Sequence, residues 1–344
     1  MTPSWWTRPV IGRALWERPL HQSGSISAVA ATADRVVVHE RHTRLACLSR
    51  HDGSLCWDVP VGTWPRAVVA AGDRCMVLPQ NADHLSCLDL ATGAVMWRAP
   101  LRPYTGHVVV SGETVVVGGW RGYTPLAAFD LNDGRPLWRT PHRKAAVLPL
   151  PWNDGVLVGS GPEVRLVDPR DGRELLRWRL PEPVPDHEAA FTMIDAGRCL
   201  VRCGPRSVVC VRPSAEDADR VFRHDADLLP EAAEFRGGVL WLREPGTRYL
   251  AVDPETGSVL WRVDVGQPFA RGVVHDGDGF VLAGQGGMLF RLGRGGHIIE
   301  RAWASVPRVT GLLDLGTGDA LMATEATLRM VALAHAGEGD VADA

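Results

Sequence analysis

A repeat of about 40 residues constrains this chain more than any other feature of its sequence. Four segments share a short apolar strand, a polar turn that ends in glycine, and a second strand with tryptophan four residues after that glycine; they are 45–57, 85–97, 126–138 and 250–261. The glycine supplies the positive φ that a tight hairpin turn needs. The tryptophan supplies a large apolar plate for packing one sheet against the next.

The spacing of these tryptophans predicts the number of repeats. Trp16, Trp57, Trp97 and Trp138 are separated by 41, 40 and 41 residues. The equivalent position is Leu176 in a weaker copy, Trp261 in the fourth segment and Arg301 in another weaker copy. The 85 residues from Leu176 to Trp261 correspond to two repeats. Eight outer-strand positions of this kind are typical of propeller blades.

The ends of the chain complement each other. Residues 12–16 match the last strand of a repeat, and residues 320–332 match the first strands of one. We therefore expect an all-β fold: a single eight-bladed β-propeller of four-stranded antiparallel blades over 12–333, closed by an N-terminal strand at 14–20. Closure removes exposed sheet edges. Residues 1–11 and 334–344 are expected to be tails.

Composition excludes several classes of function. The net charge is −3, lysine occurs once, at Lys144, and no long basic run is present, so a nucleic acid partner is not expected. The chain has no run of eighteen apolar residues, so no membrane span is predicted. The N-terminus lacks the apolar core of a signal peptide. Seven cysteines without a Cys-x-x-Cys motif suggest free thiols. The sequence thus predicts a cytoplasmic protein and leaves its oligomeric state open.

The pattern Asp-x-x-Thr-Gly-x-x-x-Trp occurs at 89–97 and 253–261. It resembles the repeat of pyrroloquinoline-quinone-like (PQQ-like) propellers, and the resemblance covers essentially the whole chain. That superfamily includes quinoprotein alcohol dehydrogenases, an outer-membrane assembly lipoprotein and sensor domains of bacterial kinases. The resemblance implies the fold and leaves the activity open.

Two members of the superfamily are disfavoured by the residues present. The dehydrogenases would bring an adjacent-cysteine disulfide over the quinone and a calcium site of carboxylate and amide ligands. This chain has no adjacent cysteines and no such cluster, so neither a quinone nor any other cofactor is predicted. The missing lipoprotein signal argues against the assembly lipoprotein.

The strand order of a propeller separates two faces. The turns between the first and second and between the third and fourth strands form one face, here called the turn face. Connections between blades and loops between the second and third strands form the other, here called the loop face. The Asp-x-x-Thr-Gly turns belong to the turn face and are expected to be scaffold, with aspartates that cap turns. Function is expected on the loop face, around the channel mouth.

Candidate ligand-binding residues lie in the connections between blades. A cationic series near the starts of successive inner strands favours an anionic ligand and comprises Arg66, His107, Lys144, Arg271 and Arg308. Aromatic candidates, of a kind that binding surfaces favour, are Trp64, Tyr104, Phe269 and Trp303. These positions depend on register, because a slip of one residue turns a side chain to the other face.

A second set combines imidazoles and carboxylates in three consecutive connections. Its members are His142, His187, Glu188, His224 and Asp225. Such groups are suited to acid–base catalysis near neutral pH. A divalent metal ranks lower, because no His-x-His or His-x-x-x-His spacing supports it.

Three functions remain open from the sequence. The first is a binding module for a small anionic or polar molecule, or for a protein, at the loop face. The second is a non-redox enzyme of a specialised bacterial pathway, such as a cyclase, lyase or hydrolase, that uses the histidines and carboxylates. A quinone-dependent oxidoreductase ranks last. No nucleotide loop or Ser/His/Asp motif raises the enzyme above the binding module.

Overall fold

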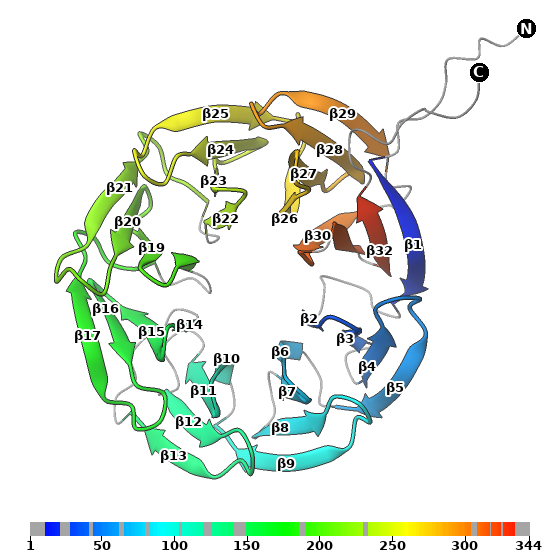
Figure 1. Cartoon of the computed structure of the whole chain (residues 1–344), viewed down its shortest axis with the longest axis vertical. Helices are drawn as coiled ribbons and strands as arrows, with labels where there is room; N and C mark the ends of the chain where they lie inside the picture. Colours follow the sequence, from blue (N-terminus) through cyan, green and yellow to red (C-terminus); the bar gives the residue numbers. More distant parts are fainter. Residues whose placement is uncertain are drawn as a thin grey trace, which may run out of the picture.

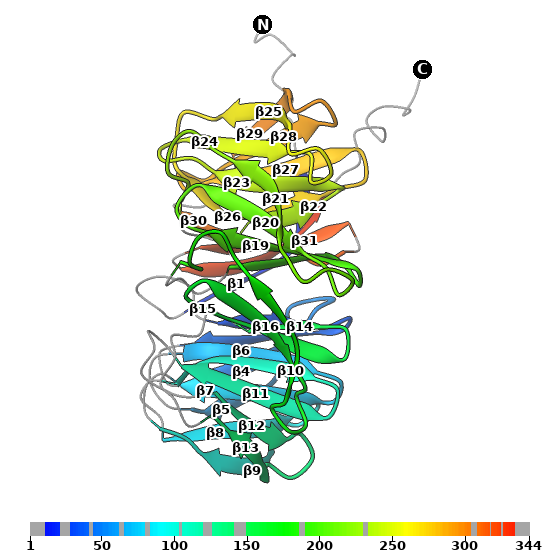
Figure 2. The same ribbon diagram turned by 90° about the vertical axis from the view of Figure 1, so that its left-hand side faces the viewer.

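The fold is a β-propeller, seen in a computed structural model of the chain. Four-stranded antiparallel sheets are arranged in a ring, with short strands at the centre and long strands at the rim (Figures 1 and 2). No helix occurs among the residues that the structure describes. These residues are 11–20, 28–40, 44–61, 65–79, 83–102, 105–119, 126–140, 149–185, 190–229, 233–303, 308–316, 318–324 and 326–333.

Six sheets have four strands each, paired in chain order from the centre outward. They are β2 (Val29–Ala31), β3 (Arg35–Glu40), β4 (Arg44–Ser49) and β5 (Leu55–Pro60); β6 (Pro65–Ala71), β7 (Arg74–Pro79), β8 (His84–Asp89) and β9 (Val95–Pro100); β10 (Thr105–Ser111), β11 (Thr114–Gly119), β12 (Ala127–Asp130) and β13 (Pro136–Arg139); β14 (Leu150–Trp152), β15 (Gly155–Ser160), β16 (Glu163–Val167) and β17 (Glu174–Arg179); β18 (Phe191–Asp195), β19 (Arg198–Cys203), β20 (Ser207–Val211) and β21 (Asp219–Arg223); and β22 (Glu234–Arg236), β23 (Val239–Arg243), β24 (Arg248–Val252) and β25 (Val259–Asp264).

The seventh sheet has eight strands in two antiparallel halves, joined by the single parallel pair Arg271–Gly311. One half comprises β26 (Phe269–His275), β27 (Gly279–Gly284), β28 (Met288–Gly293) and β29 (Ile298–Trp303). The other comprises β30 (Val309–Asp314), β31 (Asp319–Thr324), β32 (Thr327–Leu333) and β1 (Gly12–Pro19).

The first strand of the chain therefore completes a sheet made by the last three. Strand β1 pairs antiparallel with β32 from Gly12 opposite Leu333 to Pro19 opposite Thr327 (Figure 1). A buried ion pair secures its beginning, since Arg291 lies 2.5 Å from Asp276 and also donates to the Ile11 carbonyl at 2.9 Å. Strand β1 and the residue before it thus contact both halves of the eight-stranded sheet.

A β-bulge recurs in every outer strand, one residue before the tryptophan position of the repeat. The bulged residues are Leu15, Cys56, Met96, Leu137, Leu175, Val221, Leu260 and Ile299. Bulges interrupt the outer edge of a sheet and so hinder pairing with another chain. In β29 the bulge is followed by Glu300, so the tryptophan-equivalent position predicted at Arg301 is one residue too late.

Each regular tryptophan packs on the next sheet. The indole of Trp97 lies under Gly134, where an added Cβ would come within 2.5 Å of the ring, and its Nε1 donates to the Leu131 carbonyl at 2.9 Å. Gly134 has a φ of +74°. The same arrangement recurs for Trp57 with Gly93 and the Leu90 carbonyl. The predicted roles of the turn glycine and the tryptophan plate are thus confirmed at these positions.

The aspartates of these turns act as caps. Asp89 accepts hydrogen bonds from the Thr92 backbone N–H and hydroxyl, both at 2.7 Å. These bonds, the hydroxyl first, hold the pKa of the Asp89 carboxyl below its ordinary value. The turns therefore have the structural role that the sequence predicts for them.

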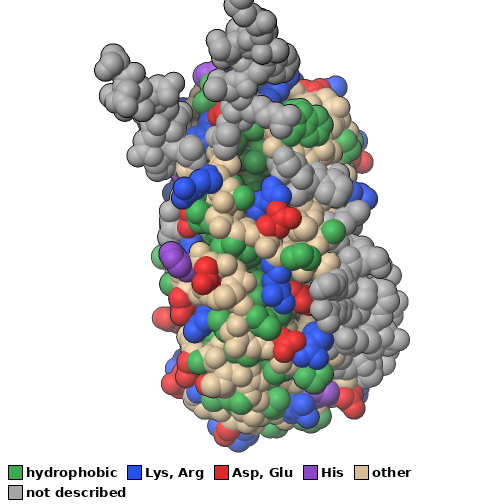
Figure 3. Space-filling model, turned by 90° about the vertical axis from the view of Figure 1, so that its right-hand side faces the viewer, with side chains coloured by type: hydrophobic (Ala, Val, Ile, Leu, Met, Phe, Trp, Pro, Cys, Tyr) green, Lys and Arg blue, Asp and Glu red, His purple; other side chains and the backbone are tan. Residues whose placement is uncertain are grey.

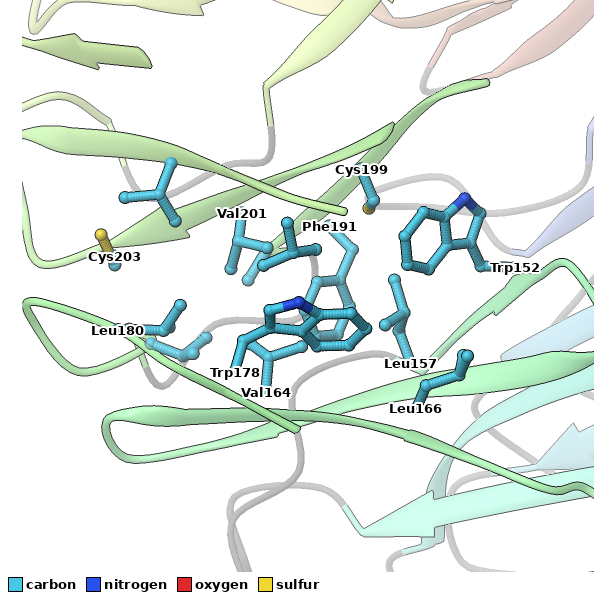
Figure 4. Close-up of a cluster of buried hydrophobic side chains, with 14 residues drawn as sticks. Trp152, Leu157, Val164, Leu166, Trp178, Leu180, Phe191, Cys199, Val201 and Cys203 are labelled. Carbon is cyan, nitrogen blue, oxygen red and sulfur yellow. The ribbon is translucent and has the colours of Figure 1, made fainter. Parts of the chain in front are cut away.

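Packing changes where the repeat is degenerate. Leu176 replaces the tryptophan in β17, and Trp178, two residues later, is 1% exposed within the cluster shared by β14–β17 and β18–β21 (Figure 4). Trp178 donates to the Arg212 carbonyl at 3.0 Å and lies near Trp152, with ring centroids 5.9 Å apart.

On the surface, the rim near β1 shows small hydrophobic patches among interleaved basic and acidic side chains (Figure 3).

Candidate functional site

Many of the candidate residues on the loop face lie outside the described residues. These are His142, His187, Glu188, Trp64, Tyr104 and Lys144. Arg66 falls in β6, at the bulge between Pro65 and Ala67, and its side chain is not described. The geometry available concerns His224, Asp225, His107, Phe269, Arg271, Trp303 and Arg308.

His224 forms a buried pair with a carboxylate that the sequence did not suggest. Its Nε2 lies 2.8 Å from Oε1 of Glu244, and the two side chains are 8% and 11% exposed. His224 directly follows outer strand β21, and Glu244 directly follows β23 of the neighbouring sheet. The pair therefore links two sheets. His224 lies far from the central channel, because a connection between blades starts at an outer strand and crosses the whole width of the ring before it reaches the next inner strand.

The neighbours of this pair are arranged as structure. The Phe222 ring stacks on His224 with centroids 6.0 Å apart, and Arg262 lies 3.9 Å from Glu244. The backbone N–H of His224 donates to the Arg206 carbonyl at 2.9 Å. Asp225, the predicted partner in acid–base chemistry, is exposed. A histidine held by a carboxylate could exchange protons, but the pair lines none of the three cavities whose walls consist of described residues, which are those lined by Trp261, Phe129 and Asp314.

Two of the predicted ligand-binding residues are buried. His107 is 5% exposed and follows the bulge between Thr105 and itself in β10, whereas Arg66 lies within the corresponding bulge of β6. The two positions differ by one residue, so the predicted cationic series does not share one register. Phe269 is 1% exposed and packs edge-on against Tyr249, with centroids 4.3 Å apart. Its position indicates packing in the core.

Three other predicted residues are exposed and lie in the same sector of the loop face. Trp303 ends outer strand β29 and is 67% exposed, the highest value among the exposed large apolar side chains of the described chain. Arg308 is exposed just before inner strand β30. Arg271 is exposed on β26 and pairs with Gly311 of β30. We call Arg271, Trp303 and Arg308 the Trp303 sector.

One half-buried acid on the inner strands was missed by the sequence. Glu234 in β22 accepts a hydrogen bond from the Val273 backbone N–H of β26 at 3.0 Å. Burial raises the pKa of Glu234, and Arg236 and Arg243 oppose that shift. The signal was a lone glutamate at the start of an inner strand, between Ala233 and Phe235. Its bond across two sheets indicates that it fastens inner strands together.

The described part of the chain offers little for metal binding, membrane insertion or attack by a cysteine thiolate. No three histidine, cysteine, aspartate or glutamate side chains there come together as a metal site would require. Nor does that part include a helix long and apolar enough to cross a bilayer. All seven cysteines are unpaired, and six of them are buried. Burial raises the pKa of the Cys47 thiol to about 12 and that of Cys203 to about 11, which makes both poor nucleophiles.

Comparison with known families agrees with this architecture. The model of the PQQ-like family described as outer membrane protein assembly factor BamB matches residues 81–214 and 160–337. This chain belongs to that family. The family predicted from the Asp-x-x-Thr-Gly-x-x-x-Trp repeat is thereby confirmed, and the matching model carries the name of the assembly factor that we did not favour from the sequence.

Solved structures share the fold at low sequence identity. The crystal structure of BamB from Moraxella catarrhalis has a TM-score of 0.76 and 16% identity, over 95% of this chain and 99% of that one. The computationally designed Ika8 protein has a TM-score of 0.73 and 15% identity, over 93% and 99%. Sqt1 of Saccharomyces cerevisiae has a TM-score of 0.72 and 9% identity, over 93% and 99%. No curated protein matches the chain in sequence.

Proposed function

We propose that this chain is a binding propeller that holds a partner protein on its loop face, at the Trp303 sector. The observation that carries the proposal is the exposure of Trp303 at the end of an outer strand, in a sector with two exposed arginines on or beside its inner strands. Tryptophan and arginine are enriched among the residues that dominate binding energy at protein interfaces. An indole that is 67% exposed adds little to the stability of the fold, and its surface is available for contact with a partner.

The family supports a partner of this kind. One relative of known structure is a BamB, and the family description names an assembly factor for outer membrane proteins. An assembly factor acts by contact with other proteins. We extend only the mode of action, contact with a protein, to this chain. A small anionic molecule at the same arginines is the alternative occupant.

Capture of a partner from a lysate of the native host tests the proposal. The full chain, Trp303→Ala and Ile299→Ala would be compared by quantitative mass spectrometry. Ile299 lies on the same strand and is 47% exposed, so it is a matched control. We expect at least one protein whose capture falls about tenfold with Trp303→Ala and is unchanged with Ile299→Ala. Equal capture by all three proteins would refute the site.

The acid–base enzyme ranks second. The observation that favours it is the 2.8 Å contact of His224 with Glu244. Against it, the pair is bounded by Phe222 and Arg262, and Asp225, the predicted acid–base partner, is exposed. A His224→Gln variant would keep a polar group beside Glu244 and should capture the partner as the wild type does.

We also propose that the scaffold has eight blades and acts in the cytosol. Eight outer-strand bulges, and one parallel pair between the halves of the large sheet, support the count. A crystal structure with continuous pairing between β26 and β30 would contradict the count of eight.

The proposed location rests on the cysteines. Seven free cysteines are compatible with a reducing compartment. Fractionation of native cells, with detection of the chain outside the cytosolic fraction, would contradict the location.

A further inference from the structure

Two adjoining cavities lie on the turn face, which the sequence predicts to be plain scaffold. The first, of about 340 Å³, lies between β22–β25 and β26–β29 and is lined by Val239, Trp261, His275, Phe280 and Arg294. The second, of about 530 Å³, reaches β30 and is lined by Phe235, Arg236, His275, Asp276 and Asp314. The cavities share Gly237, His275 and Gly277. We call the two together the turn-face groove.

One contribution to the first cavity is a short side chain at a position where two other sheets carry an arginine that reaches their neighbour. Arg74 begins β7 and reaches the turn of the next sheet, where it donates to the Leu131 carbonyl at 2.7 Å. Arg198 begins β19 and pairs with Glu255 in the turn of its neighbour. The corresponding residue at the start of β23 is Val239, which cannot span the gap.

A short turn adds to the opening. In the regular turns the glycine N–H bonds to the carbonyl four residues earlier, as Gly93 does with Asp89. Between β28 and β29, Gly296 bonds to Gly293, three residues earlier. Gly296 therefore faces the Cδ1 and Nε1 edge of Trp261, whereas Gly93 faces the Cδ2 and Cε3 edge of Trp57.

Trp261 is consequently left without the bond that the regular tryptophans make. Its Nε1 is buried and has no hydrogen-bond partner, whereas the Nε1 atoms of Trp16, Trp57, Trp97 and Trp138 each donate to a carbonyl of the next sheet. Buried donors are seldom left unpaired in native proteins, and such a group in a cavity wall suggests an absent partner. The ring also offers an aromatic wall next to Phe280, with centroids 6.4 Å apart.

Two arginines at the lip of the groove provide positive charge. Arg294 lies 3.5 Å from Asp278, and its side chain is 77% exposed. Arg236 lies 3.6 Å from Asp314, and its side chain is 40% exposed. The Arg294–Asp278 pair is exposed at both side chains and contributes little, so a ligand carboxylate can replace Asp278 as the partner of Arg294. Arginine also binds a carboxylate through two parallel hydrogen bonds.

We propose that the turn-face groove binds a small aromatic carboxylate. The ring of the ligand lies against Trp261 and Phe280, in the space left by Val239, and its carboxylate meets Arg294 or Arg236. The first cavity is of the size at which small-molecule sites begin, and its aromatic wall with convergent polar groups is typical of such sites. The groove is on the face opposite the Trp303 sector, so this inference is independent of the proposed function.

Calorimetric titration with indole-3-acetate and its neutral analogue indole-3-acetamide tests the proposal on the full chain. We expect the acid to bind about tenfold or more tightly than the amide, because only the acid pairs with an arginine. Val239→Arg, which refills the cavity as Arg74 does in its own sheet, should abolish binding. Arg294→Gln should weaken binding of the acid several-fold and leave binding of the amide unchanged.

Two controls make the outcome decisive. Arg135→Gln removes an arginine from a regular turn, where its side chain is 63% exposed, and should leave binding unchanged. Circular dichroism shows whether Val239→Arg has folded; if it has not, Arg294→Gln and the pair of probes still decide. Equal affinity for acid and amide, undiminished binding in folded Val239→Arg, or no binding of either probe would overturn the proposal.

Discussion

Two junctions between neighbouring sheets, built from the same repeat, differ in how their turn-face ends are filled. Between β6–β9 and β10–β13, Trp97 donates to the Leu131 carbonyl at 2.9 Å, and Arg74 donates to the same carbonyl at 2.7 Å. Between β22–β25 and β26–β29, Trp261 has no such bond and a cavity of about 340 Å³ remains. We refer to these as the closed and the open junction.

The difference teaches that two small changes are enough to turn a structural contact into a cavity. One is the residue at the start of the second strand, arginine in the closed junction and Val239 in the open one. The other is the turn between the third and fourth strands, which closes on Gly296 one residue earlier than the regular turns do. The flanking sheets keep their pairing in both cases. A propeller can thus vary one junction without disturbing its ring.

The largest expected effect comes from removing strand β1 together with the tryptophan contact that it makes with the next sheet. Deletion of residues 1–20 removes β1, including Trp16, which packs on Gly53 and donates to the Arg50 carbonyl at 2.8 Å. It also leaves β32 as an open edge, which invites association. We expect loss of cooperative unfolding or aggregation, measured by thermal melting and size-exclusion chromatography. Deletion of residues 1–10 leaves β1 whole and is the matched control; a folded, monodisperse 21–344 fragment would contradict closure by β1.

Substitution of the two tryptophans compares the junctions directly. Trp97→Ala should lower the free energy of unfolding by about 3–5 kcal/mol, because it empties a packed site and leaves the Leu131 carbonyl with one donor fewer. Trp261→Ala should have a smaller effect, since that ring is half-buried and makes no hydrogen bond through Nε1. Urea denaturation of both variants measures the difference. Equal losses would mean that the open junction is packed as well as the closed one.

The sequence predicted the repeating parts of this fold well because their physics is local. Glycine in a turn and tryptophan four residues later occur within one segment, so their roles at Gly93 and Trp97 could be inferred without the rest of the chain. The position equivalent to tryptophan in β29 was misplaced to Arg301. The shorter turn there is visible only when the strands are paired.

The candidate site was harder to predict because it depends on contacts between repeats. The partner of His224 is Glu244, which lies in the next repeat and in a loop of a different class. Phe269 looked like an exposed aromatic residue in a connection, but β26 begins at that residue and takes it into the core. The open junction was missed for the same reason, since the effect of Val239 appears only beside the turn of its neighbour.

A smaller effect is expected from opening the closed junction. Arg74→Val copies the residue of the open junction and removes hydrogen bonds to the Leu131 carbonyl and to Asn132. Because Trp97 still donates to that carbonyl, we expect a loss of about 1 kcal/mol in the free energy of unfolding. Urea denaturation measures the loss, and Arg135→Val, in the same turn but exposed, is the control. A loss as large as that of Trp97→Ala would show that the arginine, rather than the indole, closes the junction.

The smallest expected effect is a pH-dependent loss of stability when the aspartate that caps a regular turn is replaced. Asp168 caps the turn that receives Trp138, and its hydrogen bonds with Arg170, chiefly those of the side chain, lower the pKa of its carboxyl to about 2 against burial. A carboxyl whose pKa is lowered in the folded state adds stability above its unfolded pKa and loses it as the pH falls through the folded value. Asp168→Asn should therefore cost about 1 kcal/mol at neutral pH, a figure reduced because Arg170 is exposed, and progressively less as the pH falls from about 4 towards 2. Gly293 occupies the corresponding position of the open junction and has no carboxyl to titrate, so a Gly293→Ala control should show no such dependence between pH 4 and pH 2. Urea midpoints recorded across that range would contradict the assignment if Asp168→Asn ran parallel to the wild type.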